Sequence, residues 1–304
     1  MQSHMKISRR RFIPLAGGAF AAAAFSQRTR GTHGFPIGIQ LYMVNTELTK
    51  DPVGILKRIA DIGYTEVETA GWGRLSAAQF RDVVRDSGLR VPSAHLSFGL
   101  EDPGKLLDDA TTLGVEYVVS GMLPAKGEAV ADFFKNMNSL SADDFRHVAE
   151  RANEIGQKAK AAGLKYAYHN HNFEFRDVGD GKTGYDILLE ETDASLVNFE
   201  TDCGWMKVGG KDPVEYLKRY GNRIAMLHAK DFKSITKPVT ALFSPDKPVP
   251  TELGRGSIDY KPIVAAAIKA GVKHIFVEQE PPFKEVPAME AAEIDCRYLK
   301  SLLS

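Results

Sequence analysis

Residues 51–69 read Asp-Pro-Val-Gly-Ile-Leu-Lys-Arg-Ile-Ala-Asp-Ile-Gly-Tyr-Thr-Glu-Val-Glu-Thr, and they contain the signals of one helix followed by one strand. Asp51 is a helix N-cap, and Pro52 suits the first helical position because the N–H that proline lacks has no helical partner there. Gly63 is typical of the residue that ends a helix. Residues 64–69 then form a short run that is typical of a strand.

The same unit recurs along the chain. Further Asp-Pro pairs stand at positions 102–103 and 212–213, and glycine ends predicted helices at positions 88, 114, 163, 221 and 271. The predicted strands cover residues 37–44, 64–69, 91–96, 117–122, 165–171, 196–202, 224–231 and 274–280. The predicted helices cover residues 51–62, 76–87, 102–113, 141–162, 184–191, 259–270 and 288–303, and one more begins at position 212.

Eight strand–helix units with short connections predict an α/β protein with a single (β/α)8 TIM barrel. A doubly wound open sheet is the alternative, but it needs no eighth unit, and no Gly-x-Gly-x-x-Gly turn follows the first strand. The one long irregular stretch, residues 232–256, contains four prolines. Its position after the seventh strand predicts an active-site flap rather than a linker.

Residues 1–30 are set apart from the barrel as a tag remnant and a twin-arginine signal segment. Residues 1–4 resemble a cloning remnant, and three consecutive arginines at positions 9–11 precede the Ala-rich apolar residues 15–25. This order predicts export to the periplasm, or otherwise out of the cytoplasm, by the twin-arginine route. The apolar run is too short to span a membrane, so no stable anchor is expected after signal cleavage, whose position stays open. The predicted catalytic domain is residues 31–304.

The charge of the chain argues against a nucleic-acid partner. The whole chain has 39 basic and 39 acidic residues, and residues 1–30 hold six basic and no acidic ones, which leaves 33 against 39 and a formal charge of −6. An acidic body without a basic run is poorly suited to bind a phosphate backbone. The two cysteines, Cys203 and Cys296, are not expected to form a disulfide, because they lie on elements that a barrel keeps apart.

Four side chains at the ends of four successive predicted strands indicate a metal site. They are His169, Asp202, His228 and Glu278. If the strands are parallel, these groups converge at one end of the barrel, where TIM-barrel chemistry is found. Mixed nitrogen and oxygen ligands suit one divalent cation, Mn, Zn, Co or Fe, with Mn or Zn favoured. His171 is the alternative ligand to His169, because a one-residue change of register exchanges the inward-facing side chain.

The same rim carries further polar residues at strand ends, namely Glu68, His95, Asn170, His171, Lys230 and Glu280. Buried charge is costly unless it is paired or bound to metal, so this concentration is itself a sign of a functional site.

The chain resembles the sugar phosphate isomerase/epimerase superfamily of xylose isomerase-like TIM barrels, as an exported member with a twin-arginine signal. The resemblance covers the chain from about Phe35 onward and is strongest at residues 168–175, 227–231, 254–260 and 277–280. It implies a metal ligand after each of strands five to eight. Asp202, His228 and Glu278 match the last three, whereas His169 stands where many relatives have glutamate.

The resemblance implies metal-assisted enolisation of a keto-sugar, in which a base removes the proton beside the carbonyl. Glu278 is the candidate for both ligand and base, with His169 in a similar double role. Lys230 is expected to neutralise the substrate oxyanion, and Glu174 or Glu68 to supply a missing acid or base. The predicted substrate-binding residues are Glu68, His95, Asn170, His171 and Trp205; the tryptophan would form an apolar wall.

Three functions follow as hypotheses. The first is a metal-dependent isomerase or epimerase of a keto-sugar or sugar derivative, acting through an enediolate. The second is a metal-dependent lyase that cleaves a 3-keto-glycoside by enolisation and β-elimination. The third is a non-catalytic sugar-binding barrel. The sugar, its stereocentre, the metal and the oligomeric state stay open, including whether a homodimer or a partner subunit completes the pocket.

Overall fold

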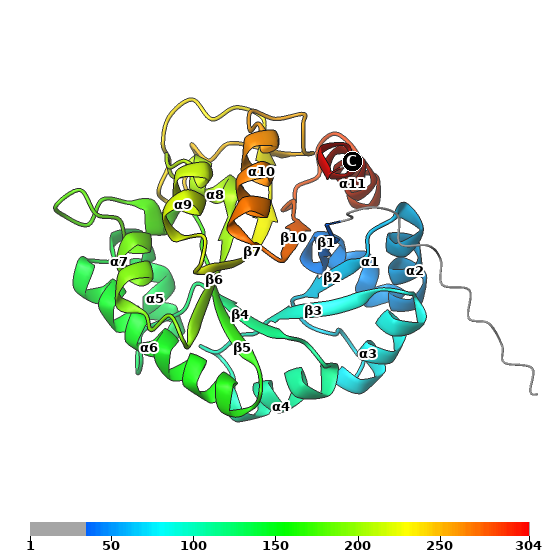
Figure 1. The fold of residues 1–304 in the computed structure, drawn as a ribbon, viewed down its shortest axis with the longest axis horizontal. Helices are drawn as coiled ribbons and strands as arrows, with labels where there is room; N and C mark the ends of the chain where they lie inside the picture. Colours follow the sequence, from blue (N-terminus) through cyan, green and yellow to red (C-terminus); the bar gives the residue numbers. More distant parts are fainter. Residues whose placement is uncertain (1–34, 304) are drawn as a thin grey trace, which may run out of the picture. The chain divides into compact units, whose positions relative to one another are not determined.

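The computed structural model describes residues 35–303, which form a closed barrel of eight parallel strands (Figure 1). The strands follow one another around the barrel in the order β1-β2-β3-β4-β5-β6-β7-β10, and β10 pairs with β1 to close it. They are β1 (Ile37–Gln40), β2 (Glu66–Thr69), β3 (Arg90–His95), β4 (Tyr117–Gly121), β5 (Lys165–His169), β6 (Val197–Asp202), β7 (Ile224–Ala229) and β10 (His274–Val277). The predicted (β/α)8 barrel is confirmed.

The main helices surround the barrel, as Figure 1 shows. They are α2 (Pro52–Ile62), α3 (Ala77–Asp86), α4 (Pro103–Leu113), α6 (Ala142–Ala161), α7 (Gly184–Glu191), α9 (Pro213–Tyr220), α10 (Tyr260–Ala270) and α11 (Ala288–Leu303). Shorter elements are α1 (Asn45–Lys50), α5 (Val130–Asn136), α8 (Cys203–Val208) and the antiparallel strands β8 (Asp231–Phe232) and β9 (Pro250–Thr251). The predicted signal segment lies outside the described residues.

The helix-start chemistry is as the sequence predicts. Asp51, Asp102 and Asp212 each accept a hydrogen bond from a backbone N–H of the first helical turn, with proline next in the chain. Gly221 differs from the other helix-ending glycines, because its φ of −56° is not left-handed. A Cβ there would lie 2.6 Å from the Cβ of Ala270, so this glycine is needed for the close approach of α9 and α10.

Several predicted strands are too long at their carboxyl ends. Residues 41–44 form a 3₁₀ helix (η1, Leu41–Val44) instead of the end of β1, β5 stops at His169, β7 stops at Ala229 and β10 stops at Val277. The apolar side chains of η1 are buried in the core. Burial therefore continues past the end of the strand, and an apolar run alone does not mark where the strand pairing ends.

The barrel interior is divided into layers. Apolar side chains fill its middle, namely Tyr117, Val119, Ala167, Met226 and Phe276. At the end where the strands begin, Glu66 lies 2.7 Å from Nδ1 of His274 and 2.5 Å from Arg90. The opposite end carries the polar groups described below.

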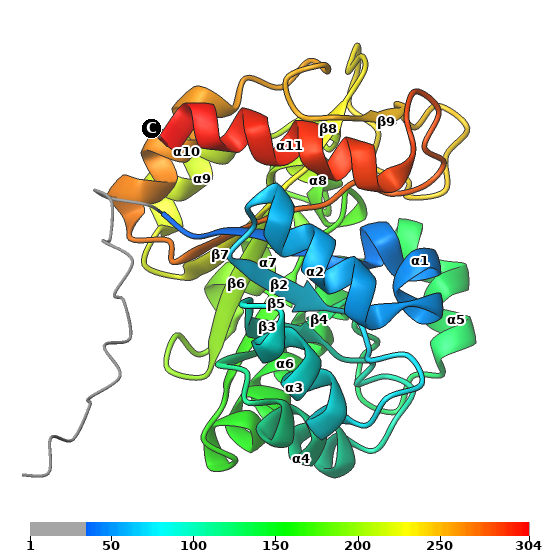
Figure 2. The same ribbon diagram turned by 90° about the vertical axis from the view of Figure 1, so that its right-hand side faces the viewer.

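The flap after β7 is anchored to the last helix. Figure 2 shows β8 and β9 beside α11, and the backbone N–H of Leu253 donates a hydrogen bond to Asp295 at 2.6 Å. Cys203 and Cys296 are both buried free thiols, as expected. Within residues 35–303, no helix combines the length and the hydrophobicity that crossing a lipid bilayer requires.

Candidate metal centre

Four side chains meet where β5, β6, β7 and β10 end. One potential ligand atom from each of His169, Asp202, His228 and Glu278 lies within 4.8 Å of the other three. We call these four residues the ligand group. His171, the alternative to His169, is not part of it. Parallel strands thus bring together residues that are up to 109 positions apart in the sequence.

Asp202 has a buried oxygen atom that makes no hydrogen bond. Its Oδ1 accepts a hydrogen bond from the backbone N–H of Trp205 at 2.7 Å and so caps α8. Its Oδ2 is buried without a hydrogen-bond partner, and Nζ of Lys230, 3.3 Å away, contacts it only as an ion pair. A buried carboxylate oxygen without a hydrogen bond is costly unless a cation compensates it. The ligand group therefore fits a divalent metal.

The two imidazoles of the ligand group are held by carboxylates beneath them. Glu200 Oε2 lies 3.2 Å from Nδ1 of His169, and Glu68 Oε2 lies 2.7 Å from Nε2 of His228. Each contact is a hydrogen bond when that nitrogen carries the proton, which leaves Nε2 of His169 and Nδ1 of His228 as the free ligand atoms. His228 Nδ1 lies 3.0 Å from Glu278, on the side of the ligand group.

His95 completes this lower layer, and we call Glu68, His95 and Glu200 the lower network. His95 Nε2 lies 2.7 Å from Glu200 and 3.2 Å from Glu68. Burial lowers the pKa of His95, but these two carboxylates outweigh it and raise the pKa to about 10. Burial and the Glu68 carboxylate raise the pKa of Glu200, but the surrounding imidazoles outweigh both and bring it to about 2. Both groups are therefore charged near neutral pH.

The pKa values of the two ligand histidines move in opposite directions. Burial and the charge of His228 hold the pKa of His169 well below its ordinary value, so this imidazole is neutral, as a metal ligand must be. Burial also lowers the pKa of His228, but the Glu200 and Glu68 carboxylates outweigh burial and hold it well above its ordinary value. A cation and a proton therefore compete for His228, and metal binding releases protons.

Glu200 was not among the predicted site residues. A signal for it exists in the strand sequence Phe-Glu-Thr-Asp at positions 199–202, because side chains two residues apart share one face of a strand. If Asp202 faces the barrel interior, Glu200 faces it too.

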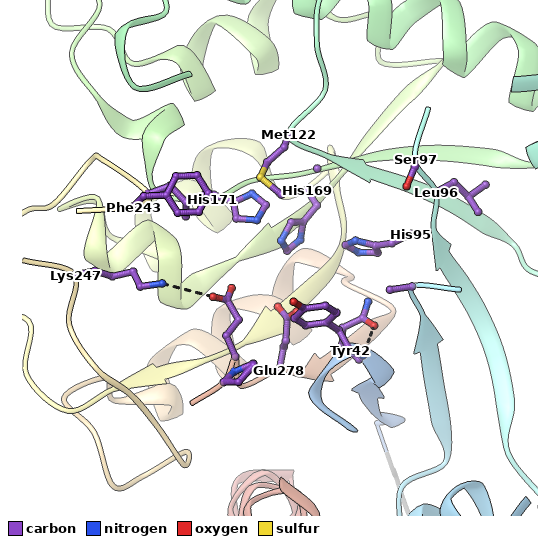
Figure 3. A pocket seen from close by; sticks show the side chains of 16 residues that line it. Tyr42, His95, Leu96, Ser97, Met122, His169, His171, Phe243, Lys247 and Glu278 are labelled. Atoms are coloured by element: carbon purple, nitrogen blue, oxygen red, sulfur yellow. Dashed lines mark hydrogen bonds and ion pairs between the residues drawn. The ribbon is translucent and has the colours of Figure 1, made fainter. Parts of the chain in front are cut away.

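A cavity of about 390 Å³ opens beside the ligand group (Figure 3). Its polar wall includes His95, His169, His171, Glu278 and Glu280, and its apolar wall includes Tyr42, Leu96, Met122, Leu242, Phe243 and Pro281. Residues 242, 243 and 247 belong to the stretch after β7, so the predicted flap does cover the site. The size is in the usual range for small-molecule pockets, about 300–1,000 Å³.

Two of the five predicted substrate-binding residues, His95 and His171, line this cavity. Glu68, Asn170 and Trp205 do not: each is completely buried behind the wall. Asn170 accepts a hydrogen bond from the backbone N–H of Asp202 at 3.1 Å and thus joins the ends of β5 and β6. The predicted contacts of these three residues with a substrate therefore have no basis in the geometry.

Lys230 is also enclosed. Its ammonium lies 2.9 Å from Glu278, 2.8 Å from Glu280 and 3.3 Å from Asp202, and its side chain is fully buried. Burial lowers its pKa, but the carboxylates outweigh burial and raise it above its ordinary value. Lys230 is thus a permanent cation that holds Glu278 in place, and its role at a substrate oxyanion stays a prediction.

Glu174 lies behind His171 and does not reach the cavity. Its carboxylate accepts hydrogen bonds from the Tyr168 hydroxyl and from the backbone N–H of His171, both at 3.0 Å. Burial raises its pKa to about 8. In this placement Glu174 supports the His171 segment, and its role as an acid or base stays a prediction.

The protein is a TIM barrel that carries histidines and carboxylates at the carboxyl ends of its strands, and these two features together define its class. The model of the xylose isomerase-like TIM barrel family matches residues 56–302. The chain belongs to this family, and the resemblance to it drawn from the sequence is confirmed, whereas export by the twin-arginine route stays a prediction.

Three similar proteins illustrate the relationship. Inosose dehydratase of Clostridium perfringens is 30% identical over 144 residues, or 45% of this chain and 48% of that protein, so the chain spans about half the length of this curated relative. A sugar phosphate isomerase/epimerase from Parabacteroides distasonis is 27% identical in its crystal structure, with a TM-score of 0.73 over 91% of this chain and 98% of that one. The IOLI protein, whose crystal structure contains a zinc atom, shares the fold, with a TM-score of 0.62 and 18% identity over 88% of this chain and 98% of that one. These relatives are sugar-processing enzymes or share their fold, in agreement with the prediction of an enzyme.

Proposed function

We propose that this protein is a divalent-metal-dependent enzyme that enolises a keto-sugar and then isomerises or epimerises it. The observation that carries this proposal is the ligand group at the wall of a cavity that also presents further ionisable side chains, among them His171 and Glu280. Mn or Zn is the proposed metal, because two imidazoles and two carboxylates suit these ions.

A divalent cation bound by the ligand group would polarise the carbonyl of a bound keto-sugar and acidify the neighbouring C–H bond. Glu278 is placed to take that proton, because 11% of its side chain is exposed toward the cavity. Burial raises its pKa, but Lys230 and His228 outweigh burial and hold the pKa well below the ordinary value, so the carboxylate is ionised at neutral pH.

His171 is the proposed partner for returning the proton. Figure 3 shows its ring across the cavity from Glu278, next to His169. Burial lowers the pKa of His171 to about 4, so at neutral pH the imidazole is uncharged, and it would return a proton to the sugar only by taking one up from Glu278 or from solvent. A proton removed on one face of the sugar and returned on the other inverts the carbon, and a proton returned to the neighbouring carbon moves the carbonyl.

The charges around the cavity favour an uncharged sugar over a sugar phosphate. Among the described residues that line it, Lys247 is the one ammonium, and it already lies 3.8 Å from Glu280. Lys230 is enclosed by three carboxylates and does not line the cavity. A phosphate group would therefore meet two glutamates, whereas the two cations that line the cavity, Lys247 and His95, are each already paired with carboxylates. Export through the predicted twin-arginine signal stays part of this proposal, since an exported enzyme would meet mostly non-phosphorylated sugars.

A lyase is the second candidate. It is supported by the relative named inosose dehydratase. It is also supported by His169, because an epimerase would have at this position the second carboxylate of its acid–base pair. On a 3-keto-glycoside, a base would remove the proton from C2, the C–H electrons would form the C1–C2 double bond, and the bond from C1 to the aglycone oxygen would break. The aglycone oxygen would take up a proton, giving an unsaturated keto-sugar and an alcohol without any oxidant.

The two functions can be tested in heavy water with the metal-loaded protein and a panel of keto-sugars and 3-keto-glycosides. We expect deuterium to enter the carbon beside the carbonyl, and we expect a chelator to abolish this exchange and added Mn or Zn to restore it. Exchange with retention of all substituents indicates an isomerase or epimerase, whereas release of an alcohol indicates the lyase.

Asp202→Asn should abolish the exchange and lower the bound metal measured by elemental analysis. Asp212→Asn is the matched control, because Asp202 and Asp212 each cap a helix and asparagine keeps that cap. Exchange that continues unchanged in the chelator-treated protein would contradict the proposal.

A further inference from the structure

Exposed apolar side chains gather around the opening of the cavity. Among residues 35–303, six large hydrophobic side chains are strongly exposed, and four of them lie on this cavity or on its neighbour: Tyr42 (49% exposed), Leu100 (70%), Phe134 (42%) and Phe243 (69%). Exposed hydrophobic side chains that are scattered singly need no explanation, but a cluster at the mouth of a site does.

A second, smaller cavity of about 130 Å³ adjoins the first. The two share four lining residues, namely Leu96, Ser97, Gly121 and Met122, so they lie side by side. The smaller cavity, which we call the side pocket, is otherwise lined mainly by apolar residues: Phe98, Leu100, Leu123, Pro124, Val130 and Phe134. Its size is close to that of the apolar cavity of about 150 Å³ that is known to hold a benzene ring in another protein.

Met122 stands where the two cavities join. Its φ of 51° is left-handed, which is uncommon for a residue other than glycine and tends to occur at functional sites. Figure 3 shows its thioether pointing toward His169 and His171 at the edge of the main cavity. A methionine here offers a flexible, polarisable surface that adapts to a flat apolar group.

Polar and apolar side chains are thus divided between two adjoining cavities. The main cavity holds the imidazoles and carboxylates, and no titratable side chain lines the side pocket among the described residues. A bare sugar has hydroxyl groups on all sides and would gain little from the apolar walls, whereas a substituted sugar would use both parts.

We infer that the substrate is a keto-glycoside whose aglycone is aromatic or similarly flat and apolar. The keto-sugar ring lies beside His95, His171 and Glu278, and the aglycone passes Met122 into the side pocket. This inference rests on the proposed function for the sugar half of the site, and it names Met122, Leu100 and Phe134 as residues that determine specificity.

Binding of matched ligands tests this independently of turnover. The probes are the phenyl and methyl glycosides of the same 3-keto-glucose, titrated calorimetrically into the metal-loaded full chain. We expect the phenyl glycoside to bind about 10- to 100-fold more tightly, which is the gain from burying one aromatic ring.

Phe134→Ser should reduce this ratio several-fold, and Leu100→Ser provides a second variant in case the first does not fold. Ile268→Ser is the control, because Ile268 is also an exposed hydrophobic residue (51%) but lies on α10 and lines neither cavity.

The outcomes separate this inference from the proposed function. A phenyl preference that Phe134→Ser removes supports the inference even when neither glycoside reacts. Equal affinity for the two glycosides, or no binding of either, overturns it even when the enzyme exchanges deuterium into free keto-sugars. A change from dimer to monomer on Phe134→Ser, with the ligand ratio unchanged, would show that the exposed residues contact a second copy and would also overturn it.

Discussion

Two histidines in the ligand group present opposite ring nitrogens to the same point. His169 is held through Nδ1 by Glu200, and His228 is held through Nε2 by Glu68. Glu68 is itself fixed by Gln40, whose amide donates at 2.8 Å, and by the Ser93 hydroxyl. Carboxylates that accept the second N–H of a metal-bound histidine orient the ring and raise its basicity. Glu68 and Glu200 are therefore positioning residues.

Glu68→Gln and Glu200→Gln should each weaken metal binding by about 10- to 100-fold, since such outer carboxylates typically contribute that much to affinity. The measurement is competition with a chromogenic chelator at constant pH. Glu66→Gln is the control for the cost of changing a buried glutamate, because Glu66 lies on the same strand and contacts His274 and Arg90 at the other end of the barrel. Equal losses of affinity in all three variants would mean that the effect is a general loss of stability.

At this scale the sequence predicted the convergence of the ligand group better than its surroundings. The meeting of His169, Asp202, His228 and Glu278 could be predicted because a strand end in a parallel barrel fixes where a side chain begins. Lys230, Asn170 and Trp205 stand at similar positions, yet their side chains point behind the wall. Side-chain direction beyond the last paired residue depends on loop packing, which no periodicity encodes.

Helices and strands differ in how well the sequence marks their ends. Asp-Pro starts and glycine ends are local signals, because the capping hydrogen bonds form within a few residues. Strand ends depend on pairing with another strand, so residues 41–44 were predicted as strand although they form η1. Sequence-based prediction has the same limit at Gly221. This glycine is needed for a close contact with Ala270 on another helix and not for a left-handed turn at the end of α9.

Asp295 on α11 gives the protein a pH-dependent stability. Its carboxylate accepts the Leu253 N–H, and burial raises its pKa well above the ordinary value, with a further contribution from Glu252. The folded state therefore keeps a proton that the unfolded state releases. Stability from this group is complete below the unfolded pKa of about 3.9 and is lost as pH rises toward the folded pKa.

Asp295→Asn should remove this loss of stability at higher pH. The asparagine side chain keeps an oxygen that can accept the hydrogen bond from the Leu253 N–H. We expect its free energy of unfolding to rise relative to the wild type between pH 4 and the folded pKa, by about 1.4 kcal/mol for each unit by which the two pKa values differ. Urea unfolding across that pH range measures it. A difference between the two proteins that does not change with pH would contradict this account.

At the scale of the whole molecule, a bound cation would join four consecutive strands. The ligand group spans β5, β6, β7 and the residue after β10, which together make half of the barrel. The unfolded chain has no such arrangement, so metal binding should stabilise the fold by mass action. The closed barrel could be predicted from the sequence, because the sequence contains eight strand–helix units. That one cation would connect half of the barrel could be inferred only from the side-chain positions in the structure.

Mn or Zn at 100 times its dissociation constant should raise the free energy of unfolding by about 2.7 kcal/mol. Thermal or urea unfolding with and without chelator measures this gain. It should disappear in Asp202→Asn and persist in Asp212→Asn, which lies outside the ligand group. A metal-induced gain of the same size in Asp202→Asn would place the cation elsewhere.

The two buried thiols can report where this barrel opens first. Cys203 follows Asp202 of the ligand group, and Cys296 follows Asp295 on α11; both thiols are buried in the folded state. An alkylating reagent would therefore modify each sulfur only during local unfolding, at a rate set by the free energy of that opening. If a cation holds one half of the barrel together, its addition should slow labelling of Cys203 more than labelling of Cys296. The labelling rates of the two thiols thus report local unfolding separately, Cys203 beside the ligand group and Cys296 on α11.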